Sequence, residues 1–331
     1  MKIMVYEARP DERADLEKQA ALHGVELSVT DAVPTLENAS LAAGCIGVSI
    51  LGQGCIDAAL LDAYHALGIR YLSTRTIGYD HIDLDHARSI GLRVCSASYA
   101  PNGVADFTVM MILMCLRHYK QALWRGQVND FSLTGLQGRE MKDLTIGIIG
   151  TGRIGAQVAR NLSGFGCRIL AYDLRRNPAV EPQVTYVDFD TLLAQSDVIT
   201  LHMPLLDSNR HIINRDSIAK MRDGVVIVNC SRGELADIEA LIEGIETGKI
   251  GALGMDTVEG DEGIIHADHR VDILPNRNWF YLHQFRNVIM TQHMAFYTDA
   301  AVSSMVDCGI GGICQMAAGE SCPTELTGPV Q

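Results

Sequence analysis

Two side chains that could bind and protonate a small anion each follow an apolar run of the 331-residue chain. Arg232 comes just after residues 225–228, and arginine is the natural bidentate partner of a carboxylate. His293 comes after residues 288–291, and histidine most readily gives and takes protons near neutral pH. If both runs are strands of an open α/β sheet, both side chains lie where such sheets bind ligands. Considered one at a time, a salt-bridged loop arginine and a structural histidine are the alternatives.

Four acidic residues lie between these two segments, directly after the apolar run 252–255: Asp256, Glu259, Asp261 and Glu262. A carboxylate hydrogen-bonded to His293 would favour the protonated imidazole and set its orientation. Solvated loop acids are the alternative for most of the four. The other histidines have no patterned acidic or cysteine companions, so no metal site is expected.

A glycine motif, Gly150-Thr-Gly-Arg-Ile-Gly155, follows a predicted strand and opens a predicted helix. One glycine of such a motif permits the tight turn, one lets the backbone approach a pyrophosphate, and one allows close packing of helix and strand. Asp173 ends the next predicted strand, 18 residues after Gly155, where a carboxylate binds the adenosine ribose. A glycine-rich turn without a ligand is the weaker alternative. The cofactor-binding residues expected from this motif are Gly150, Gly152, Arg153, Ile154, Gly155 and Asp173.

Asp173 also predicts which dinucleotide binds. Its charge would repel a 2′-phosphate, which favours NAD over NADP. Arg175 and Arg176 follow it and would soften that preference if they bound a phosphate. Solvated surface arginines are the favoured interpretation of this pair.

Apolar runs alternate with helical periodicity, as in parallel sheets covered by helices. We expect strands at 2–6, 46–51 and 71–73, helices at 11–23 and 57–67, and a long buried helix at 103–123. Further strands are expected at 144–149, 167–172, 198–201, 225–228, 252–255 and 288–291, and helices at 153–165, 189–195 and 235–247. Residues 260–285 should form a long functional loop, and the tail after Glu320 should be loosely ordered.

Composition bounds the class of protein. Hydrophobic residues make up 47% and charged residues 20%, so a sizeable core forms, and the length suggests roughly two domains. With 27 basic and 40 acidic residues the net charge is -13, which disfavours nucleic acids and anionic membranes as partners. A small anionic substrate is still compatible, since one nearby arginine outweighs the distant charges.

Three features indicate a cytoplasmic protein. The nine cysteines are scattered without a C-x-x-C pair, which is typical of reduced thiols rather than a disulfide framework. The opening MKIMVYEARPDER contains too short an apolar run for a signal peptide. The most apolar stretch, residues 107–116, is shorter than a membrane span.

Taken in order, these motifs resemble those of the D-2-hydroxyacid dehydrogenase family and, within it, the D-lactate dehydrogenase branch. The resemblance covers residues 2 to about 316. Besides the glycine motif, it rests on Ser73-Thr-Arg-Thr-Ile-Gly78-Tyr-Asp-His-Ile-Asp, Tyr99-Ala-Pro-Asn-Gly-Val-Ala-Asp106, Leu201-His-Met203-Pro204, Asn229-Cys-Ser-Arg232-Gly and His293-Met-Ala-Phe-Tyr-Thr.

The resemblance implies an α/β fold of two domains, a Rossmann nucleotide-binding domain and a flavodoxin-like substrate domain, both with parallel sheets. Residues 1–100 and 297–331 would form the substrate (catalytic) domain. Residues 101–296 would form the NAD-binding domain, and the cleft between the two would close on the substrate. The same analogy implies a homodimer, through the apolar segment 103–123, unless that segment is simply part of the core.

The catalytic triad of the family is Arg, Glu and His. Arg232 and His293 match it, whereas Asp261 stands in the Glu position and is one methylene shorter. Either its loop moves inward or Glu259 or Glu262 takes the role. We expect Asp261, because its register from the other two triad positions matches the family without a gap. A second departure is Gln292, where a proline usually precedes the histidine, and this loosens the backbone.

The resemblance also implies NAD as cofactor and a 2-oxo or 2-hydroxy acid as substrate. Further cofactor contacts would come from Met203, Pro204, Asn209, Cys230, Ser231 and Asp256. Substrate contacts would come from Leu51, Thr76, Ile77, Gly78, Tyr99, Phe296 and Tyr297. In the implied reaction NADH reduces C2 of a 2-oxo acid held by Arg232, and His293 protonates the oxygen to give the (R)-2-hydroxy acid.

Leu51 holds a position where many lactate-selective relatives carry tyrosine. A leucine would leave room for a larger apolar substrate group, unless Leu51 is simply a core residue. We therefore expect an enzyme that accepts pyruvate and prefers phenylpyruvate or 2-oxoisocaproate.

Other functions stay open. Phosphoglycerate dehydrogenase would want further basic residues near the substrate, for which Arg75 is the obvious candidate. A formate dehydrogenase would typically carry a glutamine beside the partner of the catalytic histidine, which is not found. A non-catalytic NAD-sensing scaffold needs neither Arg232 nor His293, so the presence of both argues against it.

Overall fold

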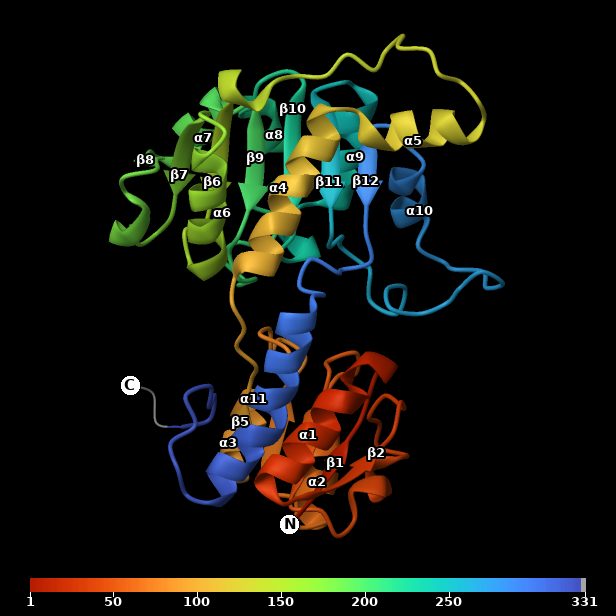
Figure 1. Cartoon of the computed structure of the whole chain (residues 1–331), viewed down its shortest axis with the longest axis vertical. Coiled ribbons are helices and arrows are strands. Elements are labelled where there is room, and N and C mark those ends of the chain that lie inside the picture. Colours follow the sequence, from red (N-terminus) through yellow and green to blue (C-terminus); the bar gives the residue numbers. More distant parts are fainter. Residues whose placement is uncertain (329–331) are drawn as a thin grey trace. The chain divides into compact units, whose positions relative to one another are not determined.

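The computed structural model describes residues 1–328, and the chain divides into two compact units (Figure 1). The first unit comprises Met1–Ala100 together with the chain from Tyr297 onward, and the second comprises Pro101–Phe296. Each unit is built on one parallel sheet flanked by helices.

The first unit has a five-stranded sheet with the order β2-β1-β3-β4-β5, which is the flavodoxin-like order. Its strands are β1 (Lys2–Val5), β2 (Glu26–Val29), β3 (Gly47–Ile50), β4 (Tyr71–Thr74) and β5 (Arg93–Cys95). Its helices are α1 (Arg13–His23), α2 (Ala58–Ala66), α3 (Leu84–Ser89) and α11 (Asp299–Ala317).

Both faces of this sheet are buried, because successive side chains of a strand point to opposite faces. Ile3 and Val5 of β1 pack with Ile310 of α11 in one apolar cluster. Met4 packs with Leu61 of α2 in the cluster on the other face. The alternation along β1 therefore fixes which helices cover which face.

Helix α11 is the one helix of residues 1–328 that is long and apolar enough to cross a membrane, and half of its apolar window is buried. It packs against α1 and β4, and Val306, Ile310 and Ile313 belong to the core of the first unit. Its apolar composition is thus explained by this packing.

The second unit has a seven-stranded sheet with the order β12-β11-β10-β9-β6-β7-β8, a Rossmann order extended by one strand. Its strands are β6 (Thr145–Ile149), β7 (Arg168–Tyr172), β8 (Thr185–Tyr186), β9 (Val198–Leu201), β10 (Val225–Asn229), β11 (Ile250–Met255) and β12 (Val288–Met290). Its helices are α4 (Asn102–Leu116), α5 (Tyr119–Gln127), α6 (Arg153–Ser163), α7 (Phe189–Gln195), α8 (Arg215–Lys220), α9 (Ile238–Glu246) and α10 (Arg277–His283).

The central strands β6, β9 and β10 are buried along their whole length, as expected for a parallel sheet covered on both faces. Figure 1 shows α4 and α6 on one face and α8 and α9 on the other. Asp188, Asn214 and Asp237 cap the N-termini of α7, α8 and α9 with their side chains. These helices therefore begin where a capping side chain satisfies their free N–H groups.

Three expectations from the sequence need correction. Residues 103–123 form two helices rather than one. His118 adopts a φ of +51°, and this interrupts the helical conformation between α4 and α5. The segment 260–285 contains α10. The tail after Glu320 is fixed as far as residue 328, and the last three residues lie outside the described part.

The tail is fixed by interactions with β5. The Arg93 guanidinium donates to both carboxylate oxygens of Glu325, at 2.8 and 2.6 Å. The backbone amides of Ser96 and Leu326 donate to the carbonyl oxygens of Thr324 and Val94. These partners are more than 200 residues apart in sequence, so no local pattern could reveal them.

Candidate active site

The glycine motif forms the turn between β6 and α6. Gly150 has a φ of +93°, in the left-handed region that favours glycine. A Cβ at Gly150 would lie 2.6 Å from the carbonyl oxygen of His202, and a Cβ at Gly155 would lie 1.9 Å from the carbonyl oxygen of Gly150. The helix therefore passes closer to this turn than any larger residue would allow.

The N-terminus of α6 suits an anionic ligand. The helix begins at Arg153 with Gly152 as its N-cap residue, and no side chain caps it. A Cβ at Gly152 would meet nothing within 4 Å, so the space in front of the helix is open. The first N–H groups of a helix have no partner within the helix and carry the positive end of its dipole. Residues 150–155 therefore fit the pyrophosphate of a dinucleotide.

Asp173 follows β7 and lies beside this turn. Its Oδ2 accepts hydrogen bonds from the amide and the hydroxyl of Thr151, at 2.6 and 3.1 Å. Its Oδ1 accepts from the amide of Arg175 at 2.9 Å. The guanidinium of Arg176 lies over the ring of Tyr186, with its carbon 5.5 Å from the ring centroid. The carboxylate thus stands where Rossmann folds bind the adenosine ribose.

A second loop, after β9, is tied to the end of β10. The side-chain amide of Asn209 donates to the carbonyl oxygen of Pro204 at 2.8 Å, and the hydroxyl of Ser231 donates to that of Met203 at 2.6 Å. Cys230 is buried, and burial raises the pKa of its thiol, so it stays protonated. The structure brings these five residues together beyond the carboxyl ends of β9 and β10.

Arg232 stands in a tight turn after β10. The side-chain amide of Asn229 donates to the carbonyl oxygen of Arg232 at 2.7 Å, and the amide of Ser231 donates to the side-chain oxygen of Asn229 at 3.0 Å. A Cβ at Gly233 would lie 2.3 Å from the carbonyl carbon of Val258. Glycine at this position therefore lets the turn with Arg232 lie against the acidic loop after β11.

Asp256 follows β11 and holds the segment that carries His293. Its carboxylate, in a residue only 1% exposed, accepts hydrogen bonds from the Thr291 hydroxyl at 2.5 Å, the Met294 amide at 2.9 Å and the Ala295 amide at 2.8 Å. These bonds flank His293, whose φ of +52° is unfavourable for a residue with a side chain. Such strain persists where the surroundings fix it, and it is common at functional sites.

The imidazole of His293 lies among charged groups of the same unit. Burial lowers its pKa to about 4, the negative charge of Asp256 acts in the opposite direction, and Arg232 and His266 lower it further. The structure therefore places Arg232 and Asp256 within electrostatic reach of His293. In this state the imidazole is neutral at pH 7, and only an added negative partner would charge it.

Asp261 is engaged within its own loop. Its Oδ2 accepts a hydrogen bond from the Val258 amide at 3.1 Å, and burial raises its pKa to about 6. Within residues 1–328 no hydrogen bond or ion pair joins this carboxylate to His293. The expected pairing is thus not formed in this structure, where the short side chain bonds a nearby backbone amide instead.

The other two candidate acids have different surroundings. Glu259 Oε1 lies 2.7 Å from Nε2 of His211 and 3.9 Å from a nitrogen of Arg210, and Glu262 is exposed to solvent. A carboxylate already bound by neighbouring side chains is a poor candidate to move to His293. Asp261 thus stays the preferred partner, as a prediction.

The expected substrate contacts fall in both units. Leu51 is 6% exposed and Ile77 is 37% exposed, and the Thr76 hydroxyl donates to the carbonyl oxygen of Gly78 at 2.6 Å. The Arg9 guanidinium lies over the ring of Tyr297, 5.0 Å from its centroid. In the second unit, the ring of Phe296 meets that of His293 edge-on, with centroids 6.4 Å apart.

Sequence reasoning missed His266. Its ring centroid lies 6.1 Å from that of His293, and its Nε2 lies 3.3 Å from the carbonyl oxygen of His293. It comes from a loop 27 residues earlier, without periodicity or a motif. An isolated histidine beside acidic residues gave no signal that could have placed it here.

Comparisons with known proteins agree with this architecture. Residues 109–295 match the model of the D-isomer specific 2-hydroxyacid dehydrogenase family, NAD-binding domain. The chain is 42% identical to the aromatic 2-oxoacid reductase of Clostridium sporogenes, with 93% of each chain covered.

Two solved structures extend the agreement over nearly the whole chain. The pyruvate reductase of Chlamydomonas reinhardtii superposes with a TM-score of 0.90 at 34% identity, covering 98% of both chains. The D-isomer specific 2-hydroxyacid dehydrogenase of Lactobacillus delbrueckii ssp. bulgaricus, solved with NAD, superposes with a TM-score of 0.84 at 30% identity, covering 98% of this chain and all of that one. The chain therefore belongs to the D-isomer specific 2-hydroxyacid dehydrogenase family and is an NAD-dependent oxidoreductase of hydroxy acids.

Proposed function

We propose that this enzyme reduces 2-oxo acids with bulky apolar side chains, such as phenylpyruvate or 2-oxoisocaproate, to the (R)-2-hydroxy acids, and that it also accepts pyruvate. The observation that carries the proposal is that the charges of Arg232 and Asp256 both act on His293, which puts an anion-binding group and a proton-transfer group in the same site. NADH, bound at residues 150–155 and Asp173, supplies the hydride.

The roles of the protein's own groups follow from their chemistry. The Arg232 guanidinium binds the substrate carboxylate and polarises the ketone, and its fixed positive charge stabilises the negative charge that develops on the oxygen. His293 gives a proton to that oxygen. Asp256 fixes the backbone on both sides of His293, so the imidazole stays in place for the transfer.

Protonation of His293 requires a change from the free state. Burial leaves the imidazole with a low pKa, so it is mostly neutral at pH 7. We propose that Asp261 approaches His293 when substrate binds and that its charge raises the pKa of the imidazole. Burial raises the pKa of Asp261 only to about 6, so at pH 7 the carboxylate is mostly ionised and carries the charge that this role requires.

Two observations support the preference for bulky substrates. Leu51 is a leucine, 6% exposed, in the unit expected to bind the substrate side chain, and a relative with 42% identity is an aromatic 2-oxoacid reductase. One methylene group in an apolar pocket changes kcat/KM by about 10-fold to 200-fold. Measured kcat/KM should therefore be higher for phenylpyruvate or 2-oxoisocaproate than for pyruvate. A value for pyruvate far above both would contradict the proposal.

Arg75 bears on the phosphoglycerate alternative. Its side chain is fully buried and pairs with the equally buried Glu12 at 2.9 Å. It also donates to the carbonyl oxygens of Tyr6 and Glu7. A guanidinium engaged in this way is a poor phosphate ligand, which favours an unphosphorylated substrate.

We further propose that the protein is a cytoplasmic homodimer that uses α5 and the loop after it. Helix α5 has no buried residue, and its neighbourhood exposes large apolar side chains: Tyr119, Leu123, Trp124, Val128, Phe131 and Leu133, each between 46% and 84% exposed. Patches of this kind mark protein–protein contacts, and a second copy of the chain offers the same patch in return.

A further inference from the structure

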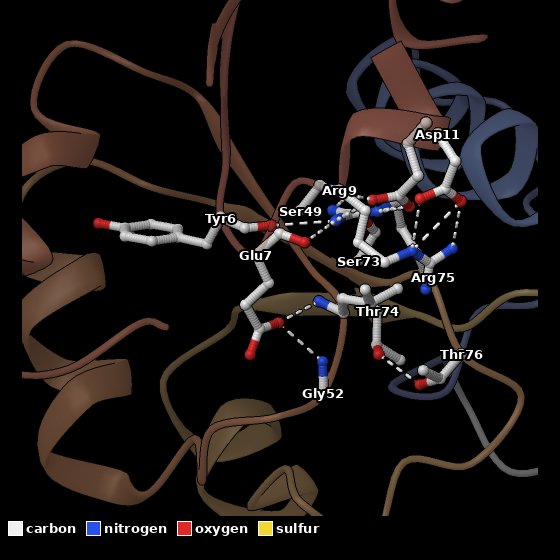
Figure 2. Close-up of polar contacts among 12 residues, drawn as sticks. Tyr6, Glu7, Arg9, Asp11, Ser49, Gly52, Ser73, Thr74, Arg75 and Thr76 are labelled. Carbon is white, nitrogen blue, oxygen red and sulfur yellow. Dashed lines mark hydrogen bonds and ion pairs between the residues drawn. The ribbon is translucent and has the colours of Figure 1, made fainter. Parts of the chain in front are cut away.

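The carboxylate of Glu7 binds four consecutive backbone amides of the loop after β3. Its Oε2 accepts from the amides of Leu51 and Gly52, the latter at 2.8 Å. Its Oε1 accepts from those of Gln53 and Gly54 at 2.8 and 3.1 Å. Figure 2 shows the Glu7 side chain extending to the backbone of Gly52. With Glu7 only 3% exposed, a buried anion thus fixes the shape of the loop that carries Leu51.

Glu7 is itself held firmly. Its φ is +54°, a conformation that residues with side chains rarely adopt, and the Arg75 guanidinium donates to the carbonyl oxygens of Tyr6 at 3.0 Å and Glu7 at 3.3 Å. The same guanidinium is bound by Glu12. Backbone strain of this kind persists only where surrounding contacts fix it, and it is often associated with function.

The opposite side of the loop meets the segment that contains Thr76 and Gly78. Gly52 has a φ of +88°, and a Cβ there would lie 3.0 Å from the ring of His81. Nε2 of His81 lies 3.3 Å from the Thr74 hydroxyl, which lies 2.6 Å from that of Thr76, as Figure 2 shows. Contacts therefore lead from the loop held by Glu7 to the segment 76–78, which is expected to contact the substrate, within one unit.

We propose that Glu7 is a positioning residue for substrate selection: it holds Leu51 at a fixed position relative to residues 76–78, so that these two expected substrate-contact segments present one fixed surface to the substrate. This inference rests on the proposed function and on the expectation from the sequence that Leu51 and residues 76–78 contact the substrate. Glu7 touches neither substrate nor cofactor in this scheme, and acts through the backbone of residues 51–54.

Glu7→Gln is the discriminating variant because it keeps the size of the side chain. A carboxylate has two acceptor oxygens, whereas an amide turns one of them into a donor. Two of the four loop amides would then face another donor and lose their partner, which frees the loop. Hydrogen exchange of amides 51–54 should become at least about tenfold faster.

The kinetic consequence is a change in KM and selectivity rather than in the chemical step. We expect Glu7→Gln to raise KM for 2-oxo acids about tenfold and to change the ratio of kcat/KM for phenylpyruvate over pyruvate at least about threefold, with kcat for the favoured acid and the Kd for NADH kept within about twofold. The Kd for NADH should hold because the dinucleotide site is built by the other unit.

Two further variants keep the test valid if Glu7→Gln also lowers stability. Glu325→Gln removes a partly buried carboxylate that pairs with Arg93 in the same unit, so it should lower Tm without changing selectivity. The double variant Glu7→Gln/Leu51→Ala should show no additional change in the selectivity ratio beyond about twofold relative to Leu51→Ala, because the effect of Glu7 passes through Leu51.

The inference is supported if the wild-type enzyme is active and the three variants behave as described. If Glu7→Gln leaves KM and the selectivity ratio unchanged, or changes them as Glu325→Gln does, the inference is overturned and the proposed function stands. If the ratio changes equally with and without Leu51, the route through Leu51 is wrong. If none of the 2-oxo acids leads to oxidation of NADH by the wild-type protein, the proposed function fails and the inference fails with it.

Discussion

The carboxylate of Asp256 accepts a hydrogen bond of 2.8 Å from the backbone amide of Ala295, two residues after His293. Together with the bonds from Thr291 and Met294, it fixes the segment on both sides of the histidine. The same charge raises the pKa of the imidazole against the effect of burial. One buried acid thus governs both the position and the protonation of His293.

Asp256→Asn tests both effects. An amide group in place of Oδ2 would face the Ala295 amide as a second donor, at a cost of about 1–3 kcal/mol. With the negative charge gone, the pKa of His293 falls, so the upper pH limit of 2-oxo acid reduction should move down. A kcat–pH profile of the variant checks this. An unchanged limit would show that Asp256 does not act on the charge of His293.

His293→Ala tests the proton donor. General acid catalysis contributes about 10²- to 10⁴-fold, so kcat for reduction should fall by that order while the Kd for NADH, measured by fluorescence titration, stays the same. His65→Ala, in α2 of the other unit, serves as the matched control. Near wild-type turnover of the His293 variant would refute the assignment.

Asp261→Asn tests the partner of the histidine. If Asp261 approaches His293 in the substrate complex, loss of its charge should lower kcat and move the upper pH limit of reduction down, because the imidazole then deprotonates at lower pH. Parallel pH profiles of Glu259→Gln and Glu262→Gln should resemble the wild type. A downward shift in either of those variants instead would assign the role to that residue.

Trp124→Glu tests the homodimer. Trp124 is 65% exposed at the centre of the apolar patch on α5, and a charge in a packed interface without a partner costs several kcal/mol. Light scattering should therefore show a dimer for the wild type and a monomer for the variant. Val271→Glu, at an apolar residue that is 94% exposed in a loop of the same unit, should stay dimeric. A wild-type monomer would contradict the proposal.

The second unit was the easier part to predict. Strands such as β6 and β10 are apolar throughout, and glycines and capping residues mark their ends, so local sequence was enough. The edge strand β2 (Glu26–Val29) was missed because none of its four residues is buried. Helix α11 was also missed. Its apolar face is explained only by packing against α1 and β4.

Interactions between distant residues explain the remaining differences. Gln292 in place of a proline predicted a loose backbone before His293, yet the bonds to Asp256 on either side fix it. The tail after Glu320 carries polar and small residues, yet Glu325 pairs with Arg93, 232 residues earlier. Neither the hydrogen bonds to Asp256 nor the ion pair with Arg93 can be inferred from residues near in sequence.

The most direct test of the central claim is the absorbance of NADH when the purified protein is mixed with phenylpyruvate, 2-oxoisocaproate or pyruvate. The proposed function predicts oxidation of NADH with all three acids, faster with one of the two bulky ones, and (R)-2-hydroxy acid as the product on a chiral column. No oxidation with any of them would contradict the assigned reaction and would favour a protein that binds NAD without turning over a substrate.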